Sequence, residues 1–419
     1  MPEALTSVND AKATILAACA PLPAEDTDLR DVAMSGVERV LALRLVSARA
    51  LPPRDNSAMD GYAVGALDED VRLPLTLPLT DASRPGHPRT TPVAPMTACA
   101  ITTGGTVPPG TFAVVMREQC DEAQATATAP TVTLAHLPRA GEHVRRRGED
   151  IDVGGGVGDV GSVLTPARLN LLWSAGVVRA PVVRRPRVGI MASGDELREV
   201  GSPLSDDVIV NSNAWAVAAA CRRLGCDVSL LGIAKDSLDD HVRVIKSGLG
   251  HDDNNGVDVL LTIGGVSVGS HDFVRPALEA VGARLSLWRI AMRPGKPLAF
   301  GALPNGALVF GLPGNPVSAM VTFRLFVQPA LRRLFGHAAD DDAGEAAVLG
   351  DDVSFHKKRG LAFFARATHR RDGERLVVTT LDRQGSGQVS GLADATCLCC
   401  FAAADETIAP GAAVRVLWL

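Results

Sequence analysis

Acidic side chains stand just beyond three apolar segments in the middle of the chain. Glu196 follows the run VGIMA, Asp236 follows the apolar run 227–233, and Asp272 closes the small-residue loop GGVSVGSHD after DVLLTI. If these runs are neighbouring parallel strands, their carboxyl ends share one edge of a sheet, and the three carboxylates meet there. Hard carboxylate oxygens suit Mg²⁺, which bridges protein groups and phosphates. The spacing therefore predicts a Mg²⁺-dependent phosphoryl or anhydride reaction.

Cationic and hydroxyl side chains gather in later loops. The segment RPGKP carries Arg293 and Lys296, Arg289 lies just upstream, and GLPGNPVS places Ser318 at the beginning of a long apolar helix. Guanidinium and ammonium groups can hold a tetrahedral anion, and glycine lets backbone N–H groups approach a ligand closely. Taken singly, each residue is more simply interpreted as a solvated turn residue or a helix-terminal group. Together, at successive strand ends of one sheet, they favour a binding crevice.

Alternating strand-like and helix-like segments from about residue 185 onward must position these groups. Strands are expected at 188–191, 227–233, 257–263, 285–291 and 307–310, and helices at 213–224, 239–249, 273–281 and 316–334. Strands separated by helices of this length form right-handed βαβ units. The pattern predicts a doubly wound, mostly parallel α/β domain whose loops at the strand carboxyl ends carry the site.

The remaining segments predict a multidomain protein, because 419 residues exceed one ordinary core. The first forty residues carry helical spacing, residues 51–137 carry short strand-like runs, and an acidic linker is expected near 338–347. The predicted domains are a helical and extended segment at 1–45 plus 146–183, an inserted β-rich domain at 46–145, the α/β domain at 184–337, and a small C-terminal β-barrel or sandwich at 346–419.

Composition and short motifs exclude several classes of function. The net charge of −5 disfavours general nucleic-acid binding. No run of eighteen apolar residues and no N-terminal basic-then-apolar leader is present, so we expect a cytoplasmic protein that binds no membrane. The eight cysteines lack paired CxxC spacing, and Cys397, Cys399 and Cys400 are interpreted as reduced, buried strand residues. A nucleotide-binding regulator is disfavoured, because GxxxxGK[ST] is missing and the GxGxxG at 156–161 follows no apolar strand and reads as a loop.

Eight motifs, in order from about residue 51 to 390, resemble those of one enzyme family. They are RDNSAMDGYAV, RRRGEDI, SGDEL, IVNSNAW, GGVSVGSHD, RPGKP, GLPGNPVSAM and RQGSG. The chain thus resembles the molybdopterin molybdenumtransferases, the molybdenum-insertion enzymes related to the gephyrin E domain. The resemblance implies a homodimeric transferase with a molybdopterin-binding α/β domain. It also implies a reaction that converts adenylylated molybdopterin and molybdate, with Mg²⁺, into molybdenum cofactor and AMP. The molybdopterin adenylyltransferase is a possible partner.

The resemblance also implies roles for individual residues. The metal and anhydride cleavage are assigned to Asp272, Asp236 and Glu196, the pterin phosphate to Gly264, Gly265 and Ser267, and the molybdate pocket to Arg293, Lys296, Ser318 and Ser386. Arg289 is expected to supply a further cation for a tetrahedral anion. In this family the NSAMDGYA segment reaches the cleft of the partner subunit. Asp60 would then face the ligand there, together with Asn56, Thr103 and Asp150. A simpler interpretation, which can hold at the same time, gives this loop Asx turns and packs Tyr62 in the core.

The chain departs from the family pattern at several positions. Ala100 stands where an arginine is usual, Phe112 stands where an acid is usual, and Leu361 replaces an arginine expected to bind molybdate. Arg359 would supply the missing cation if its loop shifts. These departures leave a second hypothesis open, in which a divergent paralogue binds or carries molybdopterin or molybdenum cofactor without efficient insertion. The retained acids and Lys296 argue against that hypothesis.

Overall fold

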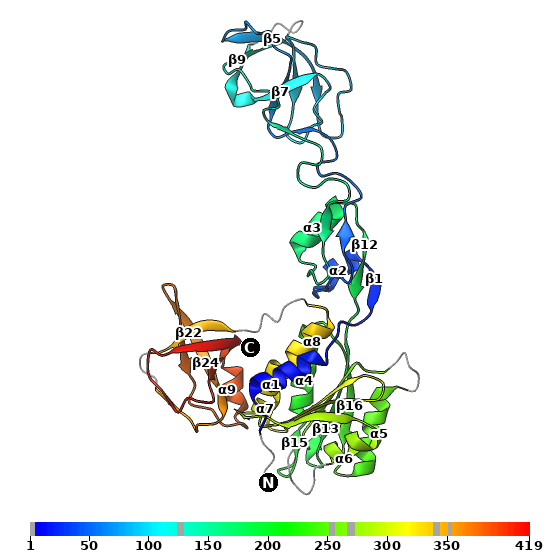
Figure 1. Cartoon of the computed structure of the whole chain (residues 1–419), viewed down its shortest axis with the longest axis vertical. Coiled ribbons are helices and arrows are strands. Elements are labelled where there is room, and N and C mark those ends of the chain that lie inside the picture. Colours follow the sequence, from blue (N-terminus) through cyan, green and yellow to red (C-terminus); the bar gives the residue numbers. More distant parts are fainter. Residues whose placement is uncertain (1–4, 124–129, 251–255, 266–272, 338–343, 351–353) are drawn as a thin grey trace. The chain divides into compact units, whose positions relative to one another are not determined.

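The computed structural model describes residues 5–123, 130–250, 256–265, 273–337, 344–350 and 354–419. The chain forms two compact units (Figure 1). One unit comprises Met1–Leu43, Val160–Leu164 and Pro181–Leu419, and the other comprises Arg44–Asp159 and Thr165–Ala180. No helix in the described residues is both long and apolar enough to cross a membrane.

A six-stranded sheet forms the centre of the first unit. Its strand order is β16 (Asp227–Ala234), β13 (Arg187–Ser193), β17 (Val259–Ile263), β21 (Leu308–Leu312), β20 (Pro297–Ala302) and β18 (Arg284–Arg289). The first four strands are parallel, whereas β20 pairs antiparallel with both of its neighbours. Every residue of β17 and β21 is buried, as expected for parallel strands covered on both faces. The predicted mostly parallel sheet is confirmed.

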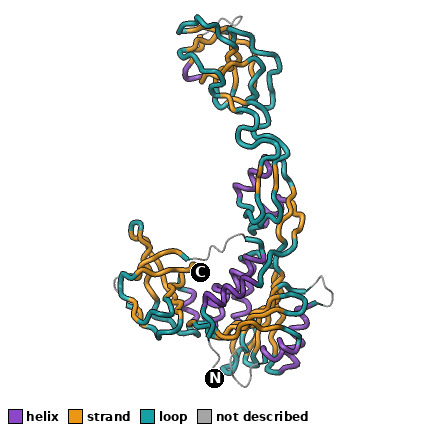
Figure 2. The backbone as a smooth tube through the Cα atoms, viewed as in Figure 1, coloured by secondary structure: helices purple, strands orange, loops and turns teal. Residues whose placement is uncertain are grey.

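Helices cover both faces of this sheet (Figures 1 and 2). On β17, Val259, Leu261 and Ile263 join one hydrophobic core, whereas Leu260 joins the other, because alternate strand residues point to opposite faces. The first core includes residues of α1 (Val8–Ala17), α4 (Ser212–Arg223), α7 (Pro316–Thr322), the π-helix η2 (Phe323–Val327) and α8 (Gln328–Leu334). The second includes residues of α5 (Leu238–Leu249) and α6 (Val274–Ala280). The doubly wound architecture is therefore confirmed.

The C-terminal region is a closed five-stranded barrel. Its strands are β24 (Ala362–Asp372), β25 (Arg375–Thr380), β22 (Glu345–Leu349), β28 (Ala413–Trp418) and β26 (Cys397–Phe401). The ring closes because β24 pairs with both β25 and β26. β19 (Met292–Arg293) pairs parallel with the first residues of β24, β23 (Phe355–His356) pairs β27 (Thr407–Ile408), and α9 (Val389–Ala393) follows β25. Cys397 and Cys399 are free and buried, as expected, and burial raises the pKa of both thiols. Cys400, predicted to be buried as well, is half-buried.

The second unit carries a β-rich sheet. Its strand order is β7 (Thr111–Met116), β4 (Gly61–Gly65), β6 (Ala98–Ile101), β5 (Leu75–Ser83), β9 (Thr131–Leu134) and β8 (Cys120–Ala123), with the 3-10 helix η1 (Arg117–Gln119) before β8. Tyr62 is buried in its core with Val64 and Leu77, so the core position expected for the tyrosine is confirmed. β3 (Asn56–Ser57) pairs β10 (Val144–Arg145). The four domain boundaries stay a prediction.

Three local expectations differ from the structure. β1 (Ala24–Asp28), which pairs β12 (Arg179–Val183), interrupts the predicted N-terminal helical segment before α2 (Leu29–Ser35), because Pro21 and Pro23 cannot continue a helix. Within the glycine run, β11 (Gly156–Gly158) pairs β2 (Leu45–Val46) where a loop was expected. β22 begins inside the predicted acidic linker, of which 338–343 lie outside the described residues. By contrast, α3 (Pro166–Ser174) begins as predicted, with the Thr165 hydroxyl accepting from the Arg168 N–H.

Candidate functional site

A cavity of about 690 Å³ lies at the carboxyl edge of the central sheet. The turns after β13, β17 and β21 line it, together with the short strand β15 (Ile209–Val210), which pairs β14 (Leu197–Arg198), and the first residues of α4. Glu196, Gly264 and Gly265 are the predicted site residues in this lining. Parallel strands bring their C-terminal turns to one edge, which explains why segments distant in sequence share this cavity.

The glycine turn after β17 requires glycine. Gly264 and Gly265 adopt φ of +91° and +63°, a region that side chains disfavour. A Cβ on Gly265 would lie 2.7 Å from Cγ2 of Val274, and one on Gly264 would lie 2.9 Å from the carbonyl oxygen of Ser193. The Gly264 N–H donates to the Leu312 carbonyl at 3.0 Å, which fixes the turn against β21. Ser267 and Asp272, predicted to follow on this loop, lie outside the described residues.

Two predicted carboxylates occupy adjoining turns. The backbone N–H of Asp236 donates to Oδ1 of Asp195 at 3.2 Å, which joins the turn after β16 to the turn after β13. Asp236 and Glu196 are exposed, and only Glu196 lines the cavity. Within the described ranges, no group of three His, Cys, Asp or Glu side chains could hold a metal ion. Because Asp272 is outside those ranges, the convergence of three carboxylates stays a prediction.

A buried histidine orients a hydroxyl at the cavity wall. His241 on α5 is fully buried, with Nδ1 2.8 Å from the Ser237 carbonyl and Nε2 2.8 Å from Oγ of Ser193. A carbonyl only accepts, so Nδ1 carries a proton, and in the tautomer with that single proton Nε2 accepts the proton of Ser193. Oγ of Ser193 can then accept a hydrogen bond from a donor in the cavity. Sequence reasoning did not single out this pair, although Ser193 begins the motif SGDEL.

A second cavity, of about 640 Å³, carries positive charge. Arg293 lines it with Lys358 and Leu361, and its guanidinium carbon lies 5.8 Å from the ring centre of Phe363. Lys357 also lines it, but its Nζ donates to the carbonyls of Leu361 at 3.0 Å and of Asp405 at 2.6 Å, which ties the loop together.

The residues that line this cationic cavity bear on the lost family arginine. Leu361 lies in the cavity wall, where it brings no charge. Arg359, the predicted substitute, is exposed and is absent from that wall, whereas Lys358 belongs to it. The geometry therefore favours Lys358 over Arg359 as the replacement cation.

Three predicted segments meet around α7. A Cβ on Gly295 of the RPGKP segment would lie 2.5 Å from Oγ1 of Thr322, which itself donates to the Ser318 carbonyl at 2.6 Å. The N–H of Val317 donates to the carbonyl of Ser386 at 3.1 Å. Ser318 is only 5% exposed, whereas Ser386 is half-buried. The structure therefore brings the RPGKP, GLPGNPVS and RQGSG motifs together around one helix.

The other two predicted cations lie at the end of one strand and just before another. Arg289 ends β18 opposite Pro297, the first residue of β20. Lys296 directly precedes β20, and its carbonyl accepts from the Ile290 N–H at 2.8 Å. Both side chains are half-buried. They are held near the RPGKP turn, and their contact with an anion stays a prediction.

The second unit holds the residues predicted to act across a dimer. The Thr103 N–H donates to Oδ1 of Asp60 at 2.6 Å, and this hydrogen bond lowers the pKa of Asp60. Asn56 lies on β3 opposite Arg145, and the exposed Asp150 follows in the turn whose N–H groups donate to the Leu51 carbonyl. One oxygen of Asp60 therefore holds the Thr103 loop, and the expected role of Asp60 at a ligand stays a prediction.

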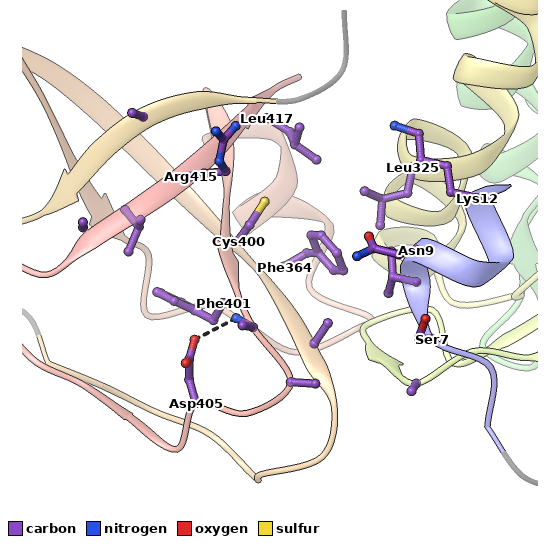
Figure 3. A pocket seen from close by; sticks show the side chains of 18 residues that line it. Ser7, Asn9, Lys12, Leu325, Phe364, Cys400, Phe401, Asp405, Arg415 and Leu417 are labelled. Atoms are coloured by element: carbon purple, nitrogen blue, oxygen red, sulfur yellow. Dashed lines mark hydrogen bonds between the residues drawn. The ribbon is translucent and has the colours of Figure 1, made fainter. Parts of the chain in front are cut away.

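A third cavity, of about 720 Å³, lies between α1 and the C-terminal barrel. Lys12 and Asn9 on α1 face Phe364, Cys400 and Arg415 of the barrel across it (Figure 3). None of the predicted site residues lines this cavity.

Asn213 is another residue of the sheet-edge cavity that sequence reasoning did not single out. Its Nδ2 donates to the Gly314 carbonyl at 2.7 Å, which joins the beginning of α4 to the GLPGNPVS turn. The sequence did contain a signal for this residue, because Asn213 belongs to the motif IVNSNAW. A single asparagine near the beginning of a helix is, however, more often a helix N-cap.

Comparison with known proteins agrees with this geometry. Residues 6–176 match the MoeA N-terminal region (domain I and II), 189–333 a probable molybdopterin binding domain, and 347–419 the MoeA C-terminal region (domain IV). Two crystal structures of the molybdopterin biosynthesis MoeA protein from Pyrococcus horikoshii align over 99% of this chain at 24% identity, with TM-scores of 0.79 and 0.75. They cover 99% and 100% of those chains, which shows a shared fold.

Curated relatives are similar in sequence along most of their length. The molybdopterin molybdenumtransferase of Haemophilus influenzae is 39% identical over 316 residues, which cover 75% of this chain and 74% of that protein. The molybdopterin molybdenumtransferase of Bacillus subtilis is 33% identical over 385 residues, which cover 91% and 87%. The chain belongs to the MoeA family, as the order and length of its motifs predict.

Proposed function

We propose that the protein is a molybdopterin molybdenumtransferase, which inserts molybdate into adenylylated molybdopterin and yields molybdenum cofactor and AMP. The observation that carries the proposal is a single turn, Pro313–Pro316, that lines the carboxylate-bearing cavity and leads directly into α7, where the hydroxyl-bearing segments meet. One region suits an anhydride and the adjoining region suits an oxyanion. The relatives that cover most of the chain carry this activity in their names, and the alternative of a non-catalytic carrier is not favoured.

The sheet-edge cavity is proposed to bind the phosphorylated pterin. Gly264 and Gly265 carry no side chain of their own, so a phosphate group can approach the backbone of the turn closely. Ser193, whose proton is held by His241, is left as an acceptor for an N–H donor. Ser267 is assigned to the same phosphate by its motif.

Mg²⁺ is part of the proposal, and the donor groups fit it. Mg²⁺ is commonly held by one or two protein carboxylates, with water and substrate phosphate completing its shell. Glu196 and Asp236, exposed on adjoining turns, match that requirement, and Asp272 is assigned as a further ligand by its motif. A bound ion would neutralise charge on the pyrophosphate during cleavage of the anhydride.

Molybdate is assigned to the segments around α7. A tetrahedral dianion needs cationic and hydroxyl donors, and Arg289, Arg293, Lys296, Ser318 and Ser386 supply these types. Leu361 brings no charge to the cavity that it lines with Arg293, whereas Lys358 in the same wall does. Arginine at 289 and 293 keeps the charge but offers a planar fork in place of a point charge.

The proposal extends to a homodimer in which the Asp60 and Thr103 loop completes the site of the partner subunit. The hydrogen bond between these two residues gives that loop a fixed shape. Transfer of substrate from the upstream adenylyltransferase and a cytoplasmic location remain predictions. Mixing an Asp60→Ala protein with an Asp236→Asn protein checks the shared site: mixed dimers regain part of the wild-type activity, whereas no recovery contradicts completion across subunits.

One assay tests the proposal. Purified protein is incubated with adenylylated molybdopterin, molybdate and Mg²⁺, and both AMP and molybdenum cofactor are measured. The expected result is one AMP released for each cofactor formed. Pterin binding without AMP release would support the carrier hypothesis instead. Asp272→Asn is expected to abolish turnover while the pterin stays bound, and wild-type turnover in that variant would refute the role given to Asp272.

A further inference from the structure

Arg366 is a completely buried arginine on β24 of the C-terminal barrel. Its Nε donates to the Arg383 carbonyl at 3.0 Å, and its Nη2 donates to the carbonyls of Arg383 and, at 3.2 Å, Gly385. Its Nη1 is buried and has no partner among the described residues. Burial lowers the pKa of this guanidinium, as expected where the charged form is poorly solvated.

The environment of Arg366 is unusual for a buried cation. Within the described residues, all of its side-chain hydrogen bonds go to backbone carbonyls, and none goes to a carboxylate. Arg39, the other buried arginine described, instead pairs with Glu25 as well as the Val183 carbonyl. A buried charge without a counter-charge is costly, so a chain that keeps one needs a compensating use for it.

The turn that Arg366 holds carries one of the predicted site residues. Gln384, in the same turn, also binds β24. Its Oε1 accepts from the backbone N–H of Arg366 at 3.1 Å. Its Nε2 donates to the carbonyl of Arg366 at 2.8 Å and to the carbonyl of Leu381 at 2.7 Å. The turn is thus fixed on the strand by two side chains. Ser386 follows at once, and its carbonyl accepts the Val317 N–H beside Ser318.

We infer that Arg366 is a positioning residue of the oxyanion pocket: its guanidinium fixes the Arg383–Gly385 turn and so sets the place of Ser386 beside Ser318. The inference rests on the proposed function, because that function assigns Ser318 and Ser386 to molybdate. Arg366 acts through the turn and needs no contact with the anion. Its fork spans two carbonyls, which a lysine reproduces only in part and a methionine not at all.

Arg366→Met and Arg366→Lys, with Arg39→Met as a matched buried-arginine control, test the inference. In Arg366→Met we expect KM for molybdate to rise roughly tenfold, as for the loss of charge-assisted hydrogen bonds. The dissociation constant of adenylylated molybdopterin should stay within about twofold of the wild-type value, since the pterin cavity lies elsewhere in the proposal. Arg366→Lys should recover part of the molybdate affinity, and Arg39→Met should lower the melting temperature without changing KM.

A second readout needs no substrate. Hydrogen exchange of the backbone around Val317 should quicken in Arg366→Lys, because the Ser386 carbonyl that accepts its N–H loses its fixed place. If folded Arg366 variants keep the wild-type KM for molybdate and the wild-type hydrogen exchange around Val317, the inference is overturned. An equal loss of affinity for molybdate and for adenylylated molybdopterin also overturns it. If Arg366→Met does not fold, Arg366→Lys and Gln384→Ala decide by the same two readouts. A wild-type protein that releases no AMP would instead count against the proposed function, whatever the exchange experiment gives.

Discussion

The two regions of the proposed site are built in opposite ways. At the sheet edge, Glu196 and Asp236 are exposed, and their loops are joined by a hydrogen bond from the Asp236 N–H to the exposed carboxylate of Asp195. Beside α7, the Ser386 turn is held by the completely buried Arg366. An exposed carboxylate can adjust to an ion and a substrate that bring their own ligands, whereas a small rigid oxyanion needs donors already in place. The difference suggests that substrate completes one region and that the protein preorganises the other.

The largest expected effect comes from removing a carboxylate at the sheet edge. Asp236→Asn should lower turnover by at least about 100-fold, the size typical of a lost charge at a reacting centre. Affinities for pterin and molybdate should change little, because the amide keeps the shape of the side chain. Steady-state AMP release and direct binding measure the two effects. Asp239→Asn, an exposed acid in the first turn of α5, is the control and should remain active.

The glycine turn should show the next largest effect. Gly265→Ala places a Cβ 2.7 Å from Cγ2 of Val274 at φ +63°, which costs roughly 1–3 kcal/mol of backbone strain. If binding of the pterin has to restore the original turn, this strain lowers the pterin affinity about tenfold or more. Molybdate binding to the free protein should be unchanged. Gly373→Ala shares a positive φ of +60° but has no atom within 4 Å of the added Cβ. Equal loss of pterin affinity in both variants would contradict the role of the turn.

A smaller effect is expected from restoring the family arginine. Leu361→Arg adds a cation to the cavity that Arg293 and Lys358 line. Exposed ion pairs contribute about 0.2–1 kcal/mol, so KM for molybdate should fall by at most about fivefold at low salt. Screening should shrink this gain as the salt concentration rises. Leu361→Met is the uncharged control, and a gain of the same size in that variant would show that charge is not responsible.

The smallest effect concerns an exposed carboxylate that already has a backbone partner. The Thr103 N–H lowers the pKa of Asp60, so the ionised form stabilises the folded protein. This contribution is fully present above about pH 4, the pKa of an unfolded aspartate, and is lost as pH falls through the lower folded pKa. Melting temperatures of wild-type protein and Asp60→Asn should therefore differ slightly at pH 6 and converge on acidification. A gap that widens at low pH would contradict this assignment.

The α/β fold was predictable from the sequence because the spacing of apolar residues alternates between that of a strand and that of a helix, with short turns between. The cavity at the carboxyl edge follows from that topology, and it gathers Glu196, Gly264 and Gly265. Contacts that depend on side-chain packing were not predictable: nothing in the local pattern around Arg366 shows that its guanidinium turns inward to hold residues 383–385. The pairing of His241 with Ser193 likewise joins residues 48 positions apart. The sequence pattern therefore predicts where helices and strands lie, whereas the contacts of buried side chains depend on the folded structure.

The place of the oxyanion is the most direct test of this account. Crystals of the protein soaked in molybdate or tungstate would show the bound metal by its anomalous scattering. The account predicts one peak beside the beginning of α7, within hydrogen-bond distance of Ser386 and Ser318 and near Arg293 or Lys296. A peak at the carboxylates of the sheet edge, or in the cavity between Lys12 and Arg415, with none beside α7, would contradict it.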